Sequence, residues 1–373
     1  MGRKVREWYS CPMAGFKTFL RWRIKNALSS LPRLHGQGSG DDFRNPAIKE
    51  KDLTVIYLFS GTYGDFVQVL PVLNQLVKVF PKSDILLFGA EKYFFDFHSI
   101  LPEKIRCLEK WAWIRRIFSP YDFLFTNAVG VYRLAFSVKA QFYSRFAYGF
   151  RYREEAEGRG YAAALSLKPE VKNFAEENLR LLELSGLVDE KDLQTEIWQG
   201  RSEHKPFSNK ADILFHIGSA GLKNDFGMEL YEKIVLNVLQ ILSKRANEEK
   251  THLELIYGPG DAEIAERVRH YLDNNSGMGN SGKENSTVTS PLPIPELKQI
   301  PLAALIQKMQ GYSGNVIAFN SFFAHLCWYL KCPAIILHRI AIPYGYDCSP
   351  LHRQVILQPE KAWSLQEFED LLH

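Results

Sequence analysis

The sequence predicts an α/β protein with two parallel-sheet domains, each carrying helices on both faces of its sheet. The chain has 373 residues, and chains longer than about 250–300 residues usually divide into two domains. Segments with strand character also alternate with segments of helical periodicity, in two separate series. A hydrophobic content of 46% and a charged content of 24% are ordinary for a globular protein.

The first series begins at residues 53–59, a continuous β-branched and aromatic run typical of a strand buried on both faces. Residues 66–80 then place apolar side chains at helical spacing. Pro71 lies inside that pattern, and proline is tolerated in a first turn, so the regular helix is predicted to begin near Gln68. The other predicted elements of this series are strands at 84–88 and 121–125 and helices at 91–100 and 171–184.

The second series repeats the alternation from residue 213 onward. Its predicted strands are 213–217, 253–257, 316–319 and 334–337, and its predicted helices are 228–245, 262–272, 302–310 and 322–330. Residues 274–293 are rich in Asn, Ser, Gly, Thr and Pro and are predicted to be a long loop. A short amphipathic helix is predicted at 364–372.

A Gly-rich stretch at residues 36–42 is typical of a linker and sets the first boundary. The predicted organisation is a basic amphipathic segment and linker (1–48), a first Rossmann-like domain (49–200), a second (201–350) and a tail helix (351–373). In such folds ligands bind outside the carboxyl ends of the strands. We therefore expect a ligand site in the cleft between the two domains.

The N-terminal 35 residues carry eight Lys or Arg side chains against the single acid Glu7, interleaved with aromatic and aliphatic residues. On a helix this pattern suits an anionic lipid interface, but a solvated basic tail, or a helix packed on its own domain, would look the same. We therefore expect a cytoplasmic protein, either free or attached peripherally to the inner face of the cytoplasmic membrane. The basic residues lie mainly on this segment and no base-reading module is visible, so no nucleic acid partner is expected.

The five cysteines show no metal-binding or redox spacing, so reduced thiols and no zinc site are expected. Residues 60–65, Ser-Gly-Thr-Tyr-Gly-Asp, directly follow the first predicted strand. The two glycines allow a tight turn, and Asp65 can either cap the following helix or act as a general base. The turn lacks both the Lys-Ser/Thr pair of a P-loop and the full dinucleotide fingerprint, so simple NTPase and dehydrogenase functions are disfavoured.

Three further strand-to-helix loops follow in the second series. Residues 216–223 combine small residues with Lys223, which suits a diphosphate, although an ordinary loop with a solvated lysine is the alternative. Residues 258–261, Gly-Pro-Gly-Asp, end in Asp261, which could accept a ribose hydrogen bond or simply cap a helix. Residues 320–325 begin with the natural caps Asn320 and Ser321.

Together these loops resemble the heptosyltransferase family of lipopolysaccharide core synthesis (glycosyltransferase family nine), which has the GT-B fold. The resemblance covers roughly residues 53–337 and is weak over about 100–210. That family opens with a strand, a short loop, a Gly-Asp pair and an apolar helix with an early proline, here Gly64, Asp65 and Pro71. Its second domain begins with a strand, a loop containing His and a downstream Lys, here His216 and Lys223.

The resemblance implies two Rossmann-like domains facing each other across a cleft. It also implies an inverting transfer of heptose or a similar sugar from a nucleotide-diphosphate donor, ADP-heptose or similar, to a lipopolysaccharide-type or other glycan acceptor. Asp65 would be the catalytic base, with no cofactor or metal required. The acceptor-side residues would be Gly61, Thr62, Tyr63 and Gly64, and the donor-binding residues would be His216, Gly218, Ser219, Lys223, Gly258, Asp261, Asn320, Ser321 and His325.

The fourth loop departs from the family. Where the family usually has Asp-Thr-Gly followed by two residues and His, residues 320–325 read Asn-Ser-Phe-Phe-Ala-His. Phe322 is expected to place a ring where backbone amides should approach the donor phosphates. This departure favours an alternative, a non-catalytic relative that binds a glycolipid or a protein partner. A nucleotide-sugar epimerase on the same fold is a second rival, which would need more acid–base groups in the cleft.

An acceptor surface is suggested by residues 133–153, where Arg and Lys side chains lie among Phe and Tyr. Such a surface suits a phosphorylated or acidic glycolipid. A poorly packed, solvent-facing insertion would have the same composition and is the alternative interpretation of this segment.

Overall fold

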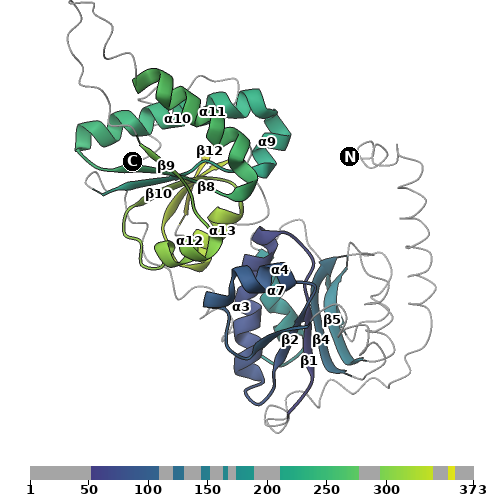
Figure 1. Cartoon of the computed structure of the whole chain (residues 1–373). Helices are drawn as coiled ribbons and strands as arrows, with labels where there is room; N and C mark the ends of the chain where they lie inside the picture. The colour runs from purple at the N-terminus through teal and green to yellow at the C-terminus, as the bar shows by residue number, and fades with distance from the viewer. Residues whose placement is uncertain are drawn as a thin grey trace, which may run out of the picture. The chain divides into compact units, whose positions relative to one another are not determined.

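The computed structural model describes residues 52–108, 121–129, 144–151, 163–166, 174–188, 211–276, 295–338 and 352–357. The chain divides into two compact units, Met1–Ile197 and Trp198–His373 (Figure 1). Each unit contains its own parallel sheet, which confirms the predicted α/β fold class. The predicted segment 1–48 and the predicted helix 364–372 lie outside the described residues, and the four-part division of the chain stays a prediction.

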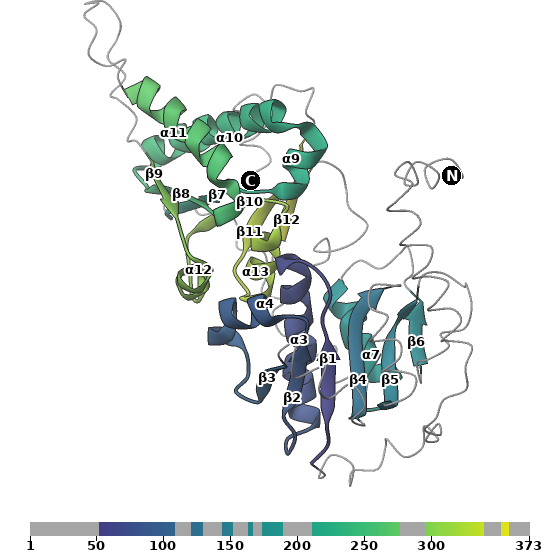
Figure 2. The ribbon, with the colours of Figure 1, turned by 45° about the vertical axis from the view of Figure 1, so that its right-hand side comes forward.

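The first unit is built on one sheet whose described strands pair in the order β3-β2-β1-β4-β5-β6, all parallel. Figure 2 shows β1, β4, β5 and β6 side by side. The strands are β1 (Val55–Leu58), β2 (Ile85–Phe88), β3 (Ile105–Leu108), β4 (Tyr121–Val129), β5 (Ser144–Arg151) and β6 (Ala163–Ser166). The helical elements are α3 (Tyr63–Val79), α4 (Glu91–Asp96), the 3-10 turn η3 (His98–Ile100) and α7 (Phe174–Leu184).

The strand order of this sheet reverses between β1 and β4. Chain connections leave β1 towards β2 on one side and arrive at β4 on the other, so the loops at the carboxyl ends of these two strands diverge and leave a crevice. β1 is fully buried, as its continuous apolar sequence predicts. The Tyr57 hydroxyl of β1 donates a hydrogen bond of 3.4 Å to Asn178 of α7, which joins the sheet to that helix. Helix α7 also packs against α3.

Helix α3 begins at Tyr63, five residues before the predicted start at Gln68, and it continues through Pro71. The proline removes one backbone donor and costs about 3 kcal/mol in a helix interior. Burying one large apolar side chain contributes about 1.5–3 kcal/mol, and α3 buries Phe66, Val69, Leu70 and Leu73 completely. Burial therefore outweighs the proline, and the prediction of a late helix start was wrong.

The second unit repeats the same topology, with described strands in the order β12-β11-β10-β7-β8-β9, all parallel. Its order reverses between β7 and β10. The strands are β7 (Ile213–His216), β8 (Leu253–Tyr257), β9 (Glu296–Gln299), β10 (Asn315–Phe319), β11 (Ala334–His338) and β12 (His352–Ile356). The helical elements are α9 (Ala220–Phe226), α10 (Met228–Glu249), the 3-10 turn η4 (Pro259–Asp261), α11 (Ala262–Ser276), α12 (Leu302–Met309) and α13 (Phe322–Tyr329).

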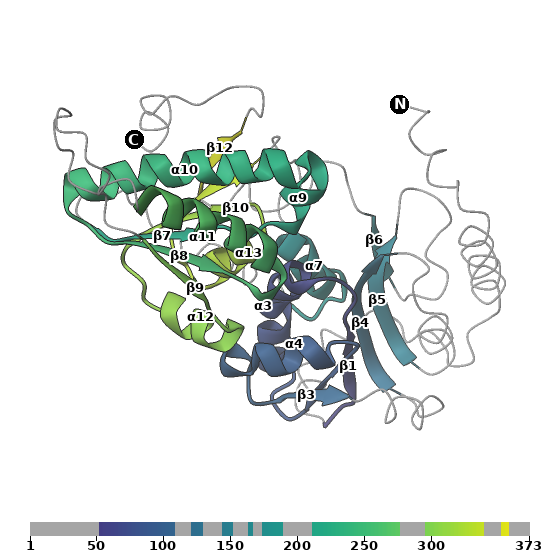
Figure 3. The same ribbon diagram turned by 45° about the horizontal axis from the view of Figure 1, so that its top comes forward.

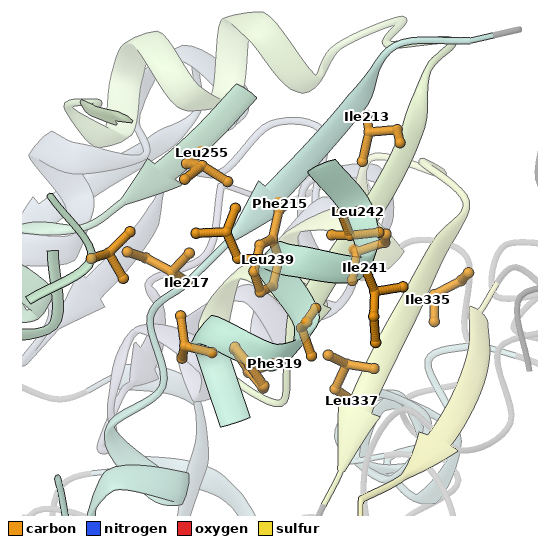
Figure 4. Packing of buried hydrophobic residues seen from close by; sticks show 14 of the residues in the cluster. Ile213, Phe215, Ile217, Leu239, Ile241, Leu242, Leu255, Phe319, Ile335 and Leu337 are labelled. Atoms are coloured by element: carbon orange, nitrogen blue, oxygen red, sulfur yellow. The ribbon is translucent and has the colours of Figure 1, made fainter. Parts of the chain in front are cut away.

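Alternate residues of the second sheet face different helix layers. Phe215, Phe319 and Leu337 belong to one buried cluster with the apolar residues of α10 and α11, including Leu239 and Leu242 (Figure 4). Figure 3 shows α10 and α11 side by side over this face. His216 points to the opposite face, where its ring stacks on a residue of α13. Figures 1 and 2 show α12 and α13 on that side. The predicted helices on both faces are confirmed for this unit.

Five described strands were absent from the sequence analysis, namely β3, β5, β6, β9 and β12. Four of them lie towards the edges of their sheets, where a strand is half-exposed and its apolar pattern is weak. The strand His352–Ile356 pairs with β11 and so belongs to the second sheet, although the sequence analysis placed residues 351–373 in a tail. No helix among the described residues is both long and apolar enough to cross a membrane.

Candidate functional site

The turn at residues 60–65 lies at the carboxyl end of β1, where the strand order of the first sheet reverses. Asn127 of β4 fixes its beginning, because the Asn127 side chain accepts a hydrogen bond from the Ser60 amide and donates one to the Ser60 carbonyl, both at 2.9 Å. Asn127 is only 3% exposed, so these two bonds are shielded from water. The turn is therefore held at a crevice where ligands bind in doubly wound sheets.

Asp65 caps helix α3 from inside the turn. Its Oδ2 atom accepts hydrogen bonds from the Thr62 amide at 2.7 Å and the Thr62 hydroxyl at 2.9 Å. Gly61 has a φ of 153°, and a Cβ atom there would lie 2.6 Å from the Asp65 side chain. A glycine is thus required for the carboxylate to sit against the turn. Both hydrogen bonds go to Oδ2, and among the described residues Oδ1 of Asp65 has no hydrogen-bond donor.

Aromatic side chains surround this turn. The Tyr93 hydroxyl donates to the Gly61 carbonyl at 2.8 Å, and its ring packs edge-on to Tyr63 at 4.9 Å. The Tyr63 hydroxyl donates to Asp96 at 2.5 Å, and Lys92 lies 4.8 Å over the Tyr63 ring. Burial, followed by the hydrogen bond to Asp96, raises the pKa of Tyr63, so this hydroxyl stays protonated at neutral pH.

The second candidate site lies at the carboxyl ends of β7, β8 and β10 in the second unit. His216 ends β7 and is 1% exposed. Its ring stacks on Phe323 at 4.6 Å and meets Phe322 edge-on at 6.0 Å. Neither ring nitrogen has a hydrogen-bond partner among the described residues. Burial lowers the pKa of His216 to about 4, although nearby Asp261 and the Gly218 backbone oppose the shift, so the imidazole is neutral at pH 7.

Lys223 and Asp261 form an ion pair in this site. The Lys223 ammonium lies 2.7 Å from Oδ1 of Asp261 and donates to the Gly260 carbonyl at 3.1 Å. The two side chains are 15% and 12% exposed. The other carboxylate oxygen, Oδ2, accepts a hydrogen bond of 3.3 Å from the Gly258 amide. A Cβ atom at Gly218 would lie 2.0 Å from Oδ2, so the carboxylate rests directly on the loop after β7.

The fourth loop joins the same site through Ser219 and Asn320. The Ser219 hydroxyl donates to the Asn320 carbonyl at 2.7 Å and accepts from the Leu222 amide at 3.3 Å, which caps α9. Ser321 caps α13 by accepting from the Phe323 amide at 3.3 Å. The bond from Ser219 to Asn320 joins two loops whose residues are 101 positions apart in the sequence. Both loops lie at the point where the second sheet reverses its strand order.

The structure therefore brings most predicted donor-side residues into one network of contacts. His216, Gly218, Ser219, Lys223, Gly258, Asp261 and Asn320 are joined by the contacts above, and Ser321 follows directly in the chain. His325 is a buried residue of α13. The ring of Phe322 lies against His216. The roles of all these residues in binding and catalysis stay predictions.

The acceptor-side residues Gly61, Thr62, Tyr63 and Gly64 form the turn and the first residues of α3, with Gly64 buried. Asn127 and Tyr93 hold this turn and were not predicted from the sequence. The polar pair Thr126-Asn127 that follows the predicted strand 121–125 was a usable signal for Asn127. Of the suggested surface 133–153, residues 144–151 form β5, and the rest lies outside the described residues. Within the described part of the chain, no three His, Cys, Asp or Glu side chains are grouped to hold a metal ion.

No family model matches the sequence, and no curated protein matches it. Solved structures do match its fold. A glycosyl transferase family 9 protein from Veillonella parvula has a TM-score of 0.53 and 15% identity, with 86% of this chain and 97% of that chain covered. The E. coli heptosyltransferase WaaC, solved with ADP-2-deoxy-2-fluoro heptose, has a TM-score of 0.53 and 13% identity over 85% and 98% of the two chains.

The E. coli ADP-heptose heptosyltransferase II has a TM-score of 0.51 and 13% identity, with 85% of this chain and 98% of that chain covered. At these identities the likeness concerns the fold. The resemblance to glycosyltransferase family nine is thereby confirmed at the level of structure, and the chain has the two parallel-sheet α/β units of the GT-B class.

Proposed function

We propose that this chain is a glycosyltransferase, which moves heptose or a similar sugar from a nucleotide-diphosphate donor to a lipopolysaccharide-type or other glycan acceptor. The observation that carries the proposal is the position of Lys223. It lies on the short helix α9, which follows β7 at the strand-order reversal of the second sheet. Its ammonium contacts the loop after β8, and Ser219, which caps α9, bonds to the loop after β10. On a fold shared with heptosyltransferases, this is the kind of position where a cation meets a ligand phosphate.

On the donor side, the second unit binds the nucleotide diphosphate. The Lys223 ammonium neutralises the diphosphate as the bond to the anomeric carbon breaks, a role that a metal ion has in other transferases. Ser219 and Asn320 fix the geometry of the neighbouring loops. The imidazole of His216 is neutral at pH 7, and its ring nitrogens can donate or accept a hydrogen bond.

On the acceptor side, Asp65 of the first unit takes the proton from the acceptor hydroxyl. The hydroxyl oxygen forms the new bond to the anomeric carbon, and the bond from that carbon to the diphosphate oxygen breaks on the opposite side. The electron pair leaves with the diphosphate, so the configuration inverts. Oδ2 of Asp65 is held by Thr62, which leaves Oδ1 for the proton. No cofactor takes part in this proposal.

The acceptor would be a glycolipid or glycan. The cationic, aromatic-rich sequence of residues 1–35 supports attachment to an anionic membrane surface on the cytoplasmic side. This part of the proposal rests on sequence alone, because those residues lie outside the described part of the chain.

Lys223→Met is expected to weaken ADP binding by about ten- to hundred-fold, because a charge-assisted contact to phosphate is lost. Calorimetric titration of the full chain with ADP measures this. Lys244→Met is the matched control, because Lys244 is a half-exposed lysine on α10 whose ion pair with Glu248 is at the surface. Equal affinity of the wild type and Lys223→Met would reject the donor-side assignment.

A non-catalytic glycolipid- or protein-binding relative is the second candidate function. Two observations favour this candidate. The charge of Lys223 is already neutralised by Asp261. Phe322 stands where the family pattern has a glycine, and its ring lies against His216. The two candidates differ in turnover. A chain that binds a donor sugar and releases no nucleotide diphosphate in the presence of any glycan acceptor would support the second candidate.

A further inference from the structure

We propose that Asp261 is a built-in counter-ion for Lys223, and that an anionic ligand binds by taking Lys223 over from Asp261. The inference rests on the proposed function, since it concerns the same anion site. It adds a residue that sets which anions the site accepts. The carboxylate acts as an internal competitor, so a ligand must offer Lys223 more negative charge than Asp261 does.

The two carboxylate oxygens of Asp261 have different hydrogen-bond partners. Oδ2 accepts a hydrogen bond from the Gly258 amide, which caps the 3-10 turn η4 that precedes α11. Among the described residues, Oδ1 accepts a hydrogen bond only from the Lys223 ammonium, at 2.7 Å. Capping therefore explains one oxygen and leaves the ion pair as a separate feature of the site.

The ion pair is shielded and lies where a ligand would bind. Its side chains are 15% and 12% exposed, so the attraction between them is weakened by water less than in a surface pair. The carboxylate also lies against Gly218, because a Cβ atom on that residue would be 2.0 Å from Oδ2. An anion that approaches the loop after β7 thus meets the Asp261 charge and the Lys223 charge together.

This arrangement predicts the class of ligand. A ligand whose charge only matches that of the carboxylate gains little when it replaces Asp261, and it also suffers repulsion from the Asp261 group that it displaces. A single phosphate group carries a charge of about −1.5 to −2 near pH 7. A diphosphate adds a second phosphate group, whose further negative oxygens can hold the ammonium against that repulsion. We therefore expect pyrophosphate and ADP to bind more tightly than inorganic phosphate and AMP.

Asp261→Asn tests the inference, because the amide oxygen can still accept from Gly258 while the negative charge is removed. The full chain and its variants are titrated calorimetrically with pyrophosphate and with ADP. Asp261→Asn is expected to bind both about ten-fold more tightly than the wild type. Glu266→Gln is the charge-matched control, an exposed acid on α11, and its affinity should stay within about two-fold of the wild type.

The Lys223→Met background separates competition from simple repulsion. If Asp261 competes for Lys223, the gain from Asp261→Asn disappears when Lys223 is absent. A gain that persists there, an unchanged or weaker affinity of Asp261→Asn, or no pyrophosphate binding by any variant would overturn the inference. Sugar transfer is measured separately: tighter pyrophosphate binding without any transfer would reject the proposed function alone, and transfer with an unchanged Asp261→Asn affinity would reject the inference alone.

Discussion

Asp65→Asn is expected to lower the rate of sugar transfer by about 10²–10⁴-fold, the usual contribution of a positioned general base. The asparagine amide can still accept a hydrogen bond from the Thr62 amide through its oxygen, so the cap of α3 is kept. What it cannot do is take a proton from the acceptor hydroxyl. The melting temperature should therefore change little while the rate falls.

A matched control for this variant lies at the other end of β1. Asp122 also accepts a hydrogen bond from a backbone amide, that of Thr54, at 2.9 Å, but at the amino-terminal end of the strands. Asp122→Asn should leave the transfer rate within about two-fold of the wild type, because ligands bind at the carboxyl ends. A transfer rate of Asp65→Asn equal to that of Asp122→Asn would mean that Asp65 only caps α3.

The buried histidine His216 is expected to make the protein less stable in mild acid. Burial lowers its pKa from 6.5 to about 4 in the folded chain. Between these two values the unfolded chain binds a proton that the folded chain does not bind. The free energy of unfolding is therefore highest above pH 6.5 and falls as the pH drops towards 4, by about 3 kcal/mol for this one group.

His216→Leu should remove this dependence. Because neither ring nitrogen has a described hydrogen-bond partner, an apolar side chain leaves no new unsatisfied group in the core. Urea unfolding at about pH 7 and about pH 4.5 should show a smaller loss of stability in the variant, by roughly 2–3 kcal/mol. His252→Leu, at an exposed histidine, is the control. An equal acid-induced loss in His216→Leu and the wild type would contradict the assignment. His338 is also buried, with its pKa lowered to about 4 by burial, and His338→Leu should act in the same direction.

The central strands of both sheets could be predicted from the sequence because they are buried on both faces. Residues 53–59, 213–217 and 253–257 are mainly apolar, with one polar residue in each run (Thr54, His216 and Glu254), and the strands β1, β7 and β8 lie within them. Edge strands such as Glu296–Gln299 carry charges on a partly exposed surface and gave no such signal. The start of α3 was misplaced because a proline rule that holds for isolated helices was outweighed by burial of its apolar face.

The positions of the site loops followed from the sequence, but the contacts within them did not. Glycines and helix caps after strands marked the loops at residues 60–65, 216–223, 258–261 and 320–325. In each unit, a doubly wound sheet places such loops at the carboxyl ends of its strands. The Lys223–Asp261 pair and the Ser219–Asn320 bond join residues 38 and 101 positions apart. Such pairings depend on the order of strands in the sheet, which local sequence patterns do not contain.

The most direct test of the proposed transferase function is whether the full chain binds a nucleotide-diphosphate sugar. The melting temperature is measured with a panel of nucleotide sugars that includes ADP-heptose, each at a concentration well above the dissociation constants usual for donors. A donor present at 100 times its dissociation constant stabilises the folded state by about 2.7 kcal/mol, which corresponds to a rise of roughly 5–10 °C for a unit of this size. We expect such a rise for at least one donor in the wild type and its loss in Lys223→Met. A melting temperature that no nucleotide sugar raises would contradict the proposed transferase function.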